Sequence, residues 1–139
     1  IPFANKRILL MGAGGAARGV ILPMLQQQPS LLAIANRTPE KARALEQLFS
    51  AHGQLMTSDY ATLRTQQFDI IINATSASLN DALPELPPEL FEGTMLVYDM
   101  MYGPDLTRFL KYAQQHGAQR LADGLGMLVE QAAESFFIW

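Results

Sequence analysis

Apolar and polar positions alternate along this chain in short blocks, which predict strands separated by helices. The segment from Arg7 to Met11 is apolar after its first residue and is followed by glycine, as is typical of a strand buried on both faces of a parallel sheet. From Gly15 to Gln27, apolar residues recur roughly at helical spacing until Pro29 and Ser30 interrupt them. Leu31 to Ala35 repeats the buried-strand pattern. This part of the chain therefore predicts a strand, a crossover helix and a second strand.

The same alternation continues through the rest of the chain. Thr38 and Pro39 predict the start of a second helix running to about His52, because a threonine side chain can cap a helix and proline fits its first position. The remaining expected strands are Gln54 to Thr57, Phe68 to Asn73, Met95 to Asp99 and Gln119 to Leu121, and the remaining helices are Leu106 to His116 and Leu125 to Trp139. Between them, the proline-rich segment from Ser76 to Pro88 predicts a surface loop rather than a linker.

Strands that alternate with helices through right-handed crossovers favour a Rossmann-like, doubly wound α/β fold. We expect a mainly parallel, six-stranded sheet with helices on both faces. The 139 residues suit a single domain that buries one substantial core. With 49% apolar and 17% charged residues, the composition is that of an ordinary globular protein rather than a disordered one.

Charge and composition exclude several classes of function. A net charge of −3 without a cluster of Lys and Arg makes nucleic acid or an anionic membrane surface an unexpected partner. No apolar run approaches the roughly 20 residues that span a bilayer, and the first residues lack a signal-peptide pattern, so a cytoplasmic location is expected. The absence of cysteine excludes disulfides and thiolate nucleophiles. Redox chemistry would therefore require a bound cofactor.

A glycine-rich turn joins the first predicted strand to the first helix, with the sequence Gly12-Ala13-Gly14-Gly15-Ala16-Ala17. Its spacing matches the dinucleotide-binding pattern: Gly12 for the tight turn, Gly14 for close approach of a pyrophosphate and Ala17 for helix packing. The exposed N–H groups at the start of a helix attract phosphate. Such a turn can also serve only as a sharp bend. Its place between a strand and a helix favours cofactor binding.

The end of the second predicted strand indicates which dinucleotide is bound. NAD-specific domains usually carry Asp or Glu about 20 residues beyond the glycines to hold the ribose hydroxyls. This chain has Asn36, Arg37 and Thr38 there, followed by Lys41. Arg37 can bind a 2′-phosphate in a fork or stack on adenine, while Thr38 and Lys41 add a hydroxyl and a charge. Alternatively, Thr38 is only a helix cap and Lys41 a solvated residue. The pattern favours NADP.

No residue of this chain stands out as a general base. His52 and His116 each end a helix that leads into a strand, which places them at the amino edge of the sheet, whereas dinucleotides bind beyond the carboxyl ends. Asp99, Tyr102 and Asp123 lie at carboxyl strand ends. The two aspartates can also serve simply to cap loops or helices. We therefore expect no catalytic residue, and no metal site, in this chain.

Three further motifs carry a resemblance to a known family: Asn73-Ala74-Thr75-Ser76, Tyr98-Asp99-Met100-Met101-Tyr102, and the segment from Ala122 to Ala133. With the glycine turn and the Asn36-Arg37-Thr38 run, the chain resembles the shikimate dehydrogenase family across nearly its whole length. The resemblance implies that Gly12 to Ala16 bind the pyrophosphate and Asn36 to Lys41 the adenosine phosphate. It implies cofactor contacts, mostly around the nicotinamide, for Asn73, Thr75, Met100, Gly124 and Met127.

The substrate side of the cleft is implied by the same resemblance. The tyrosine and glutamine that match Tyr102 and Gln131 contact shikimate in the family. Two positions depart from the family pattern. Ser78 stands where glycine is common, which puts the shape of the following loop in doubt, and Lys41 stands where bacterial relatives often have arginine. Lysine at this position is expected to weaken phosphate binding without reversing the preference for NADP over NAD.

The resemblance implies the NADP(H)-binding domain of an enzyme that reversibly reduces 3-dehydroshikimate to shikimate in chorismate and aromatic amino-acid biosynthesis. The family's catalytic lysine and aspartate belong to a preceding domain, so we expect residues 1–139 to be a domain fragment that is inactive alone. Residues from about 124 to 139 would form the helix returning to that domain. The alternatives are a quinate/shikimate dehydrogenase with dual cofactor use and a non-enzymatic NADPH-binding module. A monomer or a homodimer is expected.

Overall fold

The computed structural model describes residues 3–75, 86–100 and 106–123. Its elements are β1 (Arg7–Met11), α1 (Gly15–Gln26), β2 (Leu31–Ala35), α2 (Pro39–Phe49), the 3₁₀ helix η1 (Ser50–His52), β3 (Leu55–Ser58), the 3₁₀ helix η2 (Ala61–Thr65), β4 (Ile70–Asn73), the 3₁₀ helix η4 (Pro88–Phe91), β5 (Leu96–Asp99), α3 (Arg108–Gln115) and β6 (Leu121–Asp123). Strands and helices therefore alternate as the sequence predicts. The helix expected from Leu125 to Trp139 lies outside the described residues.

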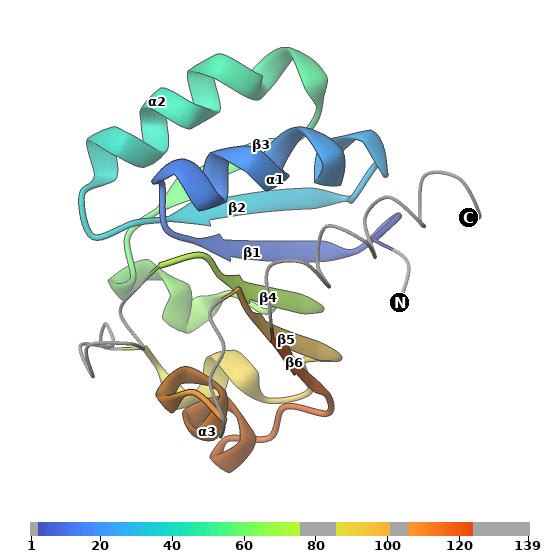
Figure 1. The fold of residues 1–139 in the computed structure, drawn as a ribbon, viewed down its shortest axis with the longest axis vertical. Helices are drawn as coiled ribbons and strands as arrows, with labels where there is room; N and C mark the ends of the chain where they lie inside the picture. Colours follow the sequence, from blue (N-terminus) through green and yellow to red (C-terminus); the bar gives the residue numbers. More distant parts are fainter. Residues whose placement is uncertain (1–2, 76–85, 101–105, 124–139) are drawn as a thin grey trace.

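The six strands form one sheet in the order β3-β2-β1-β4-β5-β6, and every pairing is parallel. This confirms the expected doubly wound sheet. The chain starts at the centre with β1, moves outward to β3, and returns to the other side of β1 with β4 (Figure 1). The strand order thus reverses between β1 and β4. In open α/β sheets, ligands bind beyond the carboxyl ends of the strands at such a point.

Successive residues of each strand face opposite layers of the core, because side chains alternate across a sheet. On one face, residues such as Ile8, Leu10 and Tyr98 pack with α1 and α2 in a buried cluster. On the other face, Leu9 and Val97 pack with η2, η4 and α3. Figure 1 shows α1 and α2 on one side of the sheet and α3 on the other. The continuous apolar strands predicted from the sequence follow from burial on both faces.

The structure differs from the sequence-based prediction mainly at the ends of elements. β6 begins at Leu121 rather than Gln119, because α3 ends near Gly117, whose φ is +102°, and the chain needs the following residues to return to the sheet. α2 ends at Phe49, and its last expected turn is the 3₁₀ helix η1. The short helices η2 and η4 were not predicted. None of the helices within the described ranges is long and apolar enough to cross a membrane.

Candidate cofactor site

The glycine turn lies at the carboxyl end of β1, where the strand order reverses. Gly12 has a φ of +107°, and its N–H donates a 2.7 Å hydrogen bond to the carbonyl oxygen of Ala35 at the end of β2. A Cβ atom placed on Gly12 would lie 3.0 Å from Cγ2 of Thr75 and 3.3 Å from the backbone of Ala74. The fold itself therefore requires glycine at this position, because both the backbone conformation and the neighbouring strand exclude a side chain.

The next two glycines are different, because the protein leaves space around them. Gly14 is the N-cap of α1 and Gly15 is its first residue, both exposed and neither with a positive φ. A Cβ atom on either one would meet nothing within 4 Å. Packing within the described chain thus does not require glycine here. The first turn of α1 contains no acidic residue, so its N–H groups present uncompensated positive charge to this open space.

Ala17 completes the turn as the sequence predicts. It is fully buried and packs in the cluster between α1 and the sheet, whereas Ala13 and Ala16 are half-buried at the edge of that cluster. A small residue at Ala17 lets α1 approach the strands closely. The first turn of α1 is therefore held against the ends of β1 and β4.

Positive charge gathers at the end of β2, beside the glycine turn. The register pairs Met11 of β1 with Ala35 of β2, so the segment from Asn36 onward begins level with Gly12. Arg37 and Lys41 are exposed, and neither forms an ion pair with a described residue. A phosphate group in this region would therefore meet two cations that no carboxylate of the described ranges already binds.

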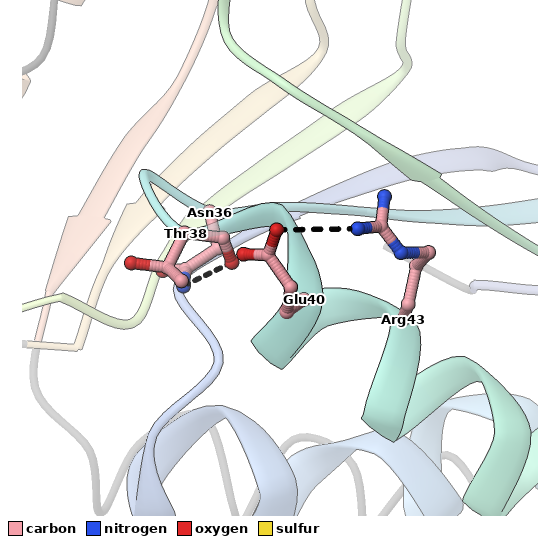
Figure 2. Close-up of polar contacts among 4 residues, drawn as sticks. All are labelled: Asn36, Thr38, Glu40 and Arg43. Carbon is pink, nitrogen blue, oxygen red and sulfur yellow. Dashed lines mark hydrogen bonds and ion pairs between the residues drawn. The ribbon is translucent and has the colours of Figure 1, made fainter.

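Thr38 is the N-cap of α2, as predicted, but the prediction that its side chain caps the helix is wrong. Its side chain makes no capping hydrogen bond. Instead, its carbonyl oxygen accepts hydrogen bonds from Lys41 N, at 3.2 Å, and from Nδ2 of Asn36, at 3.0 Å (Figure 2). The Asn36 amide thus holds the turn between β2 and α2. The Thr38 hydroxyl is not committed to the helix and can contribute to ligand binding.

Sequence reasoning missed an ion pair on the first turns of α2. Arg43 donates from a guanidinium nitrogen to Oε1 of Glu40 at 3.4 Å, and both side chains are exposed (Figure 2). The spacing of three residues on a helix surface was the available signal. Glu40 is the acidic residue of this helix start, so Arg43 offsets a negative charge that lies close in sequence to Arg37 and Lys41.

Tyr60 is a second residue that the sequence did not indicate. It follows β3, whose last residue Ser58 pairs with Ala35, so Tyr60 lies at the same sheet edge as Arg37. Burial raises the pKa of the Tyr60 hydroxyl above its usual value, and the positive charge of Arg37 partly offsets that increase. Tyr60 packs against the cluster on the η2 side of the sheet and brings a phenol close to the candidate phosphate site.

The carboxyl ends of β4 and β5 lie next to the glycine turn. Asn73 and Asp99 are fully buried, and Thr75 is half-buried. Met100 is also buried, and its N–H donates to the carbonyl oxygen of Asn73 at 3.0 Å. Cγ2 of Thr75 occupies the space that a side chain on Gly12 would need. Other predicted contacts, at Tyr102, Gly124, Met127 and Gln131, and the divergent Ser78, lie outside the described residues.

Both histidines lie at the opposite edge of the sheet, as predicted. His52 ends η1 and is separated by two residues from the start of β3, and His116 follows α3 before β6. The His116 ring packs against the ring of Tyr112, with centroids 4.4 Å apart. The described ranges contain no group of three or more His, Asp or Glu side chains that could hold a metal ion. Because they lie at the amino edge of the sheet, both histidines are remote from the glycine turn at its carboxyl edge.

The parallel sheet and the glycine turn at its reversal point define a Rossmann-like α/β domain. A family model described as Shikimate / quinate 5-dehydrogenase matches residues 2–83, and one described as Shikimate 5'-dehydrogenase C-terminal domain matches residues 124–139. The chain therefore belongs to the shikimate/quinate dehydrogenase family. This confirms the family resemblance that the sequence motifs indicated.

Individual relatives support the same assignment. The chain is 62% identical over 135 residues to a protein of Nitrosospira multiformis named shikimate dehydrogenase (NADP(+)), an alignment that covers 97% of this chain and 49% of that protein. Among solved structures, an Ael1 enzyme from Pseudomonas putida has a TM-score of 0.86 and 53% identity, over 99% of this chain and 51% of the other. A shikimate dehydrogenase in complex with NADP+ has a TM-score of 0.74 and 34% identity, over 98% and 49%. The chain spans about half the length of these relatives.

Proposed function

We propose that this chain is the NADP(H)-binding part of a cytoplasmic shikimate dehydrogenase, which reversibly reduces 3-dehydroshikimate to shikimate. The observation that carries the proposal is the pairing of two features at one sheet edge. The open start of α1, at Gly14 and Gly15, has no acidic residue in its first turn. Arg37 and Lys41, which form no ion pair with a described residue, follow the neighbouring strand. The first suits a pyrophosphate, and the second suits the extra phosphate of NADP.

In this proposal, each part of the site has a separate task. The N–H groups at the start of α1 bind the pyrophosphate, and the guanidinium of Arg37, with Thr38 and Lys41, binds the adenosine 2′-phosphate. The nicotinamide, when bound, supplies or accepts the hydride. Its ring is held beside Thr75, Met100, Gly124 and Met127. NADP-dependent relatives and a neighbour solved with NADP+ support this choice of cofactor.

The substrate and the proton-transfer groups are proposed to lie mainly outside the described residues. Tyr102 and Gln131 line the substrate side of the cleft in this proposal. The chain covers about half of its shikimate dehydrogenase relatives, which is consistent with a catalytic lysine and aspartate contributed by another domain. Neither histidine of this chain is placed to act as the general base, because both lie at the amino edge of the sheet.

A calorimetric titration tests the cofactor assignment directly. The chain is expected to bind NADPH about 100-fold more tightly than NADH, since charge-assisted bonds to the 2′-phosphate are worth about 3 kcal/mol together. Equal affinities would instead favour a quinate/shikimate dehydrogenase with dual cofactor use.

Turnover of shikimate with NADP+ should be absent in the chain alone. It should appear when the chain is fused behind the amino-terminal half of the Nitrosospira multiformis relative. NADPH binding without turnover in that fusion would favour a non-enzymatic binding module.

Replacing Glu40 with glutamine is expected to strengthen NADPH binding. The substitution removes a negative charge from the start of α2, close in sequence to the cations that receive the phosphate, and it releases Arg43. Exposed charges contribute well under 1 kcal/mol, so the gain should be about twofold to threefold. The affinity for NADH should not change. Glu92→Gln, at the end of η4 and the amino edge of the sheet, is the matched control and should leave both dissociation constants unchanged.

A further inference from the structure

A continuous chain of buried hydrogen bonds connects the carboxyl ends of β4 and β5 to the start of α3. Nδ2 of Asn73 donates to Oδ1 of Asp99 at 3.4 Å. The other carboxyl oxygen of Asp99 accepts a 2.6 Å hydrogen bond from Oγ1 of Thr107, the N-cap of α3. Asn73, Asp99 and Thr107 are all buried. A charged side chain without solvent exposure is costly unless its partners are held in place.

The donors and acceptors of this chain of bonds can be assigned from its two ends. At one end, the backbone N–H of Thr75 donates to Oδ1 of Asn73 at 3.0 Å, so the amide nitrogen of Asn73 must face Asp99. At the other end, Oγ1 of Thr107 accepts from the N–H of Leu110 at 3.2 Å, so its hydroxyl proton points to Asp99. Asp99 therefore faces a donor on each oxygen.

The same chain of bonds reaches the glycine turn through Thr75. Oγ1 of Thr75 also donates to Oδ1 of Asn73, at 2.6 Å, so two hydrogen bonds accepted by Asn73 fix the position of Thr75. Cγ2 of Thr75 and the backbone of Ala74 are the atoms that a Cβ on Gly12 would meet first. Thr75, which lies behind the glycine turn, is therefore oriented by Asn73. Asn73 is in turn oriented by its hydrogen bond to Asp99.

We propose that Asp99 is a positioning residue for the cofactor turn: by accepting from Asn73 and Thr107 together, it fixes Thr75 against Gly12 and so sets the place of the pyrophosphate. The inference rests on the proposed function, NADP(H) binding by this chain. The described hydrogen bonds of Asp99 join it to Asn73 and Thr107, so its effect on the cofactor is transmitted through Asn73 and Thr75. This role is separate from proton transfer.

A reciprocal exchange of the two side chains tests the proposal. Asp99→Asn places an amide where two donors converge, and Asn73→Asp places two carboxyl groups against each other. Each single variant is expected to weaken NADPH binding about tenfold, as the loss of one hydrogen bond to a charged group implies. The double variant Asn73→Asp with Asp99→Asn restores a donor facing an acceptor at each of the four hydrogen bonds described above. Its dissociation constant for NADPH should be at least about threefold lower than that of either single variant.

Binding is measured by calorimetry at a temperature where circular dichroism shows each variant folded. Leu90→Ala removes a buried side chain of η4, from the cluster that η4 forms with α3, and serves as the control for stability loss alone. It should lower the melting temperature without changing the NADPH dissociation constant. Single variants that bind NADPH normally, or a double variant no better than the singles, would overturn the proposal. An unmodified chain that does not bind NADPH would instead remove the proposed function, and this inference with it.

A second pair of variants at Thr107 applies if Asp99→Asn does not fold. Thr107→Val keeps the shape but loses the hydroxyl that donates to Asp99, whereas Thr107→Ser retains it. The valine variant should bind NADPH several times more weakly than the serine variant. The effect should be smaller than that of Asp99→Asn, because Thr107 is one residue further from Gly12 in the chain of hydrogen bonds. Equal binding by the two variants would contradict a role for Asp99 in positioning the turn.

Discussion

Replacing Gly14 with valine is expected to weaken NADPH binding at least about 100-fold while the chain remains folded. A side chain at Gly14 enters open space above the first turn of α1, where the proposed pyrophosphate lies, and nothing in the described chain obstructs it. It would displace the phosphate from the helix N–H groups, and two charge-assisted hydrogen bonds account for about 3 kcal/mol. Calorimetry with NADPH measures the loss. The melting temperature should fall only slightly, because the backbone at Gly14 suits any residue.

The neighbouring variant Gly12→Ala provides the contrast. Gly12 has a φ of +107°, and an added Cβ would approach Thr75 to 3.0 Å, so this variant is expected to lose stability by about 2 kcal/mol or more. Chemical denaturation distinguishes the two effects. If Gly14→Val destabilised the fold as much as Gly12→Ala, or if it bound NADPH normally, the open space above α1 would not be the pyrophosphate site.

Replacing Arg37 with alanine is expected to weaken NADPH binding about 100-fold and NADH binding no more than about threefold. The guanidinium can form two parallel hydrogen bonds with a 2′-phosphate, a group that NADH lacks. Arg37 is exposed and forms no ion pair with a described residue, so its removal should cost little stability. Titrations of the variant with both cofactors give the two ratios. The loss for NADPH should also shrink as the salt concentration rises.

Arg64→Ala is the matched control for this prediction. Arg64 is exposed, and its replacement by alanine removes the same charge. Arg64 lies on η2 before β4, at the amino edge of the sheet. Its dissociation constants for NADPH and NADH should match those of the unmodified chain. Equal losses for both cofactors in Arg37→Ala would indicate that Arg37 stacks on adenine rather than binding the phosphate, and the preference for NADP would lose its basis.

The sequence predicted the architecture well, because the central strands are buried on both faces. A strand such as β2 must then be apolar at every position, and its bounds, Leu31–Ala35, agree with the prediction. The same reasoning located β1 and the start of α1. Edge strands carry a weaker pattern, since only part of their surface is covered. The half-buried β6 was accordingly predicted two residues too early.

The positions of Gly12 and Arg37 at the carboxyl ends of β1 and β2 were predictable, because the motif places them there. Contacts that join distant parts of the chain were not predictable. The bond between Asp99 and Thr107 depends on where α3 begins relative to β5, and the closeness of Tyr60 to Arg37 depends on the pairing of β2 with β3. The unused hydroxyl of Thr38 shows a further limit, because a favoured capping residue need not use its side chain.

The hydrogen bond from Gly12 to Ala35 and the packing of Gly12 on Ala74 and Thr75 have a consequence for association. Two adjacent strands fix the shape of the loop as soon as the sheet has formed, with no help from a ligand. The conformational entropy of that loop is therefore lost during folding rather than during association. A dinucleotide bound as proposed would meet a turn whose first glycine is already fixed, and less of the free energy of its contacts would be spent on ordering the backbone.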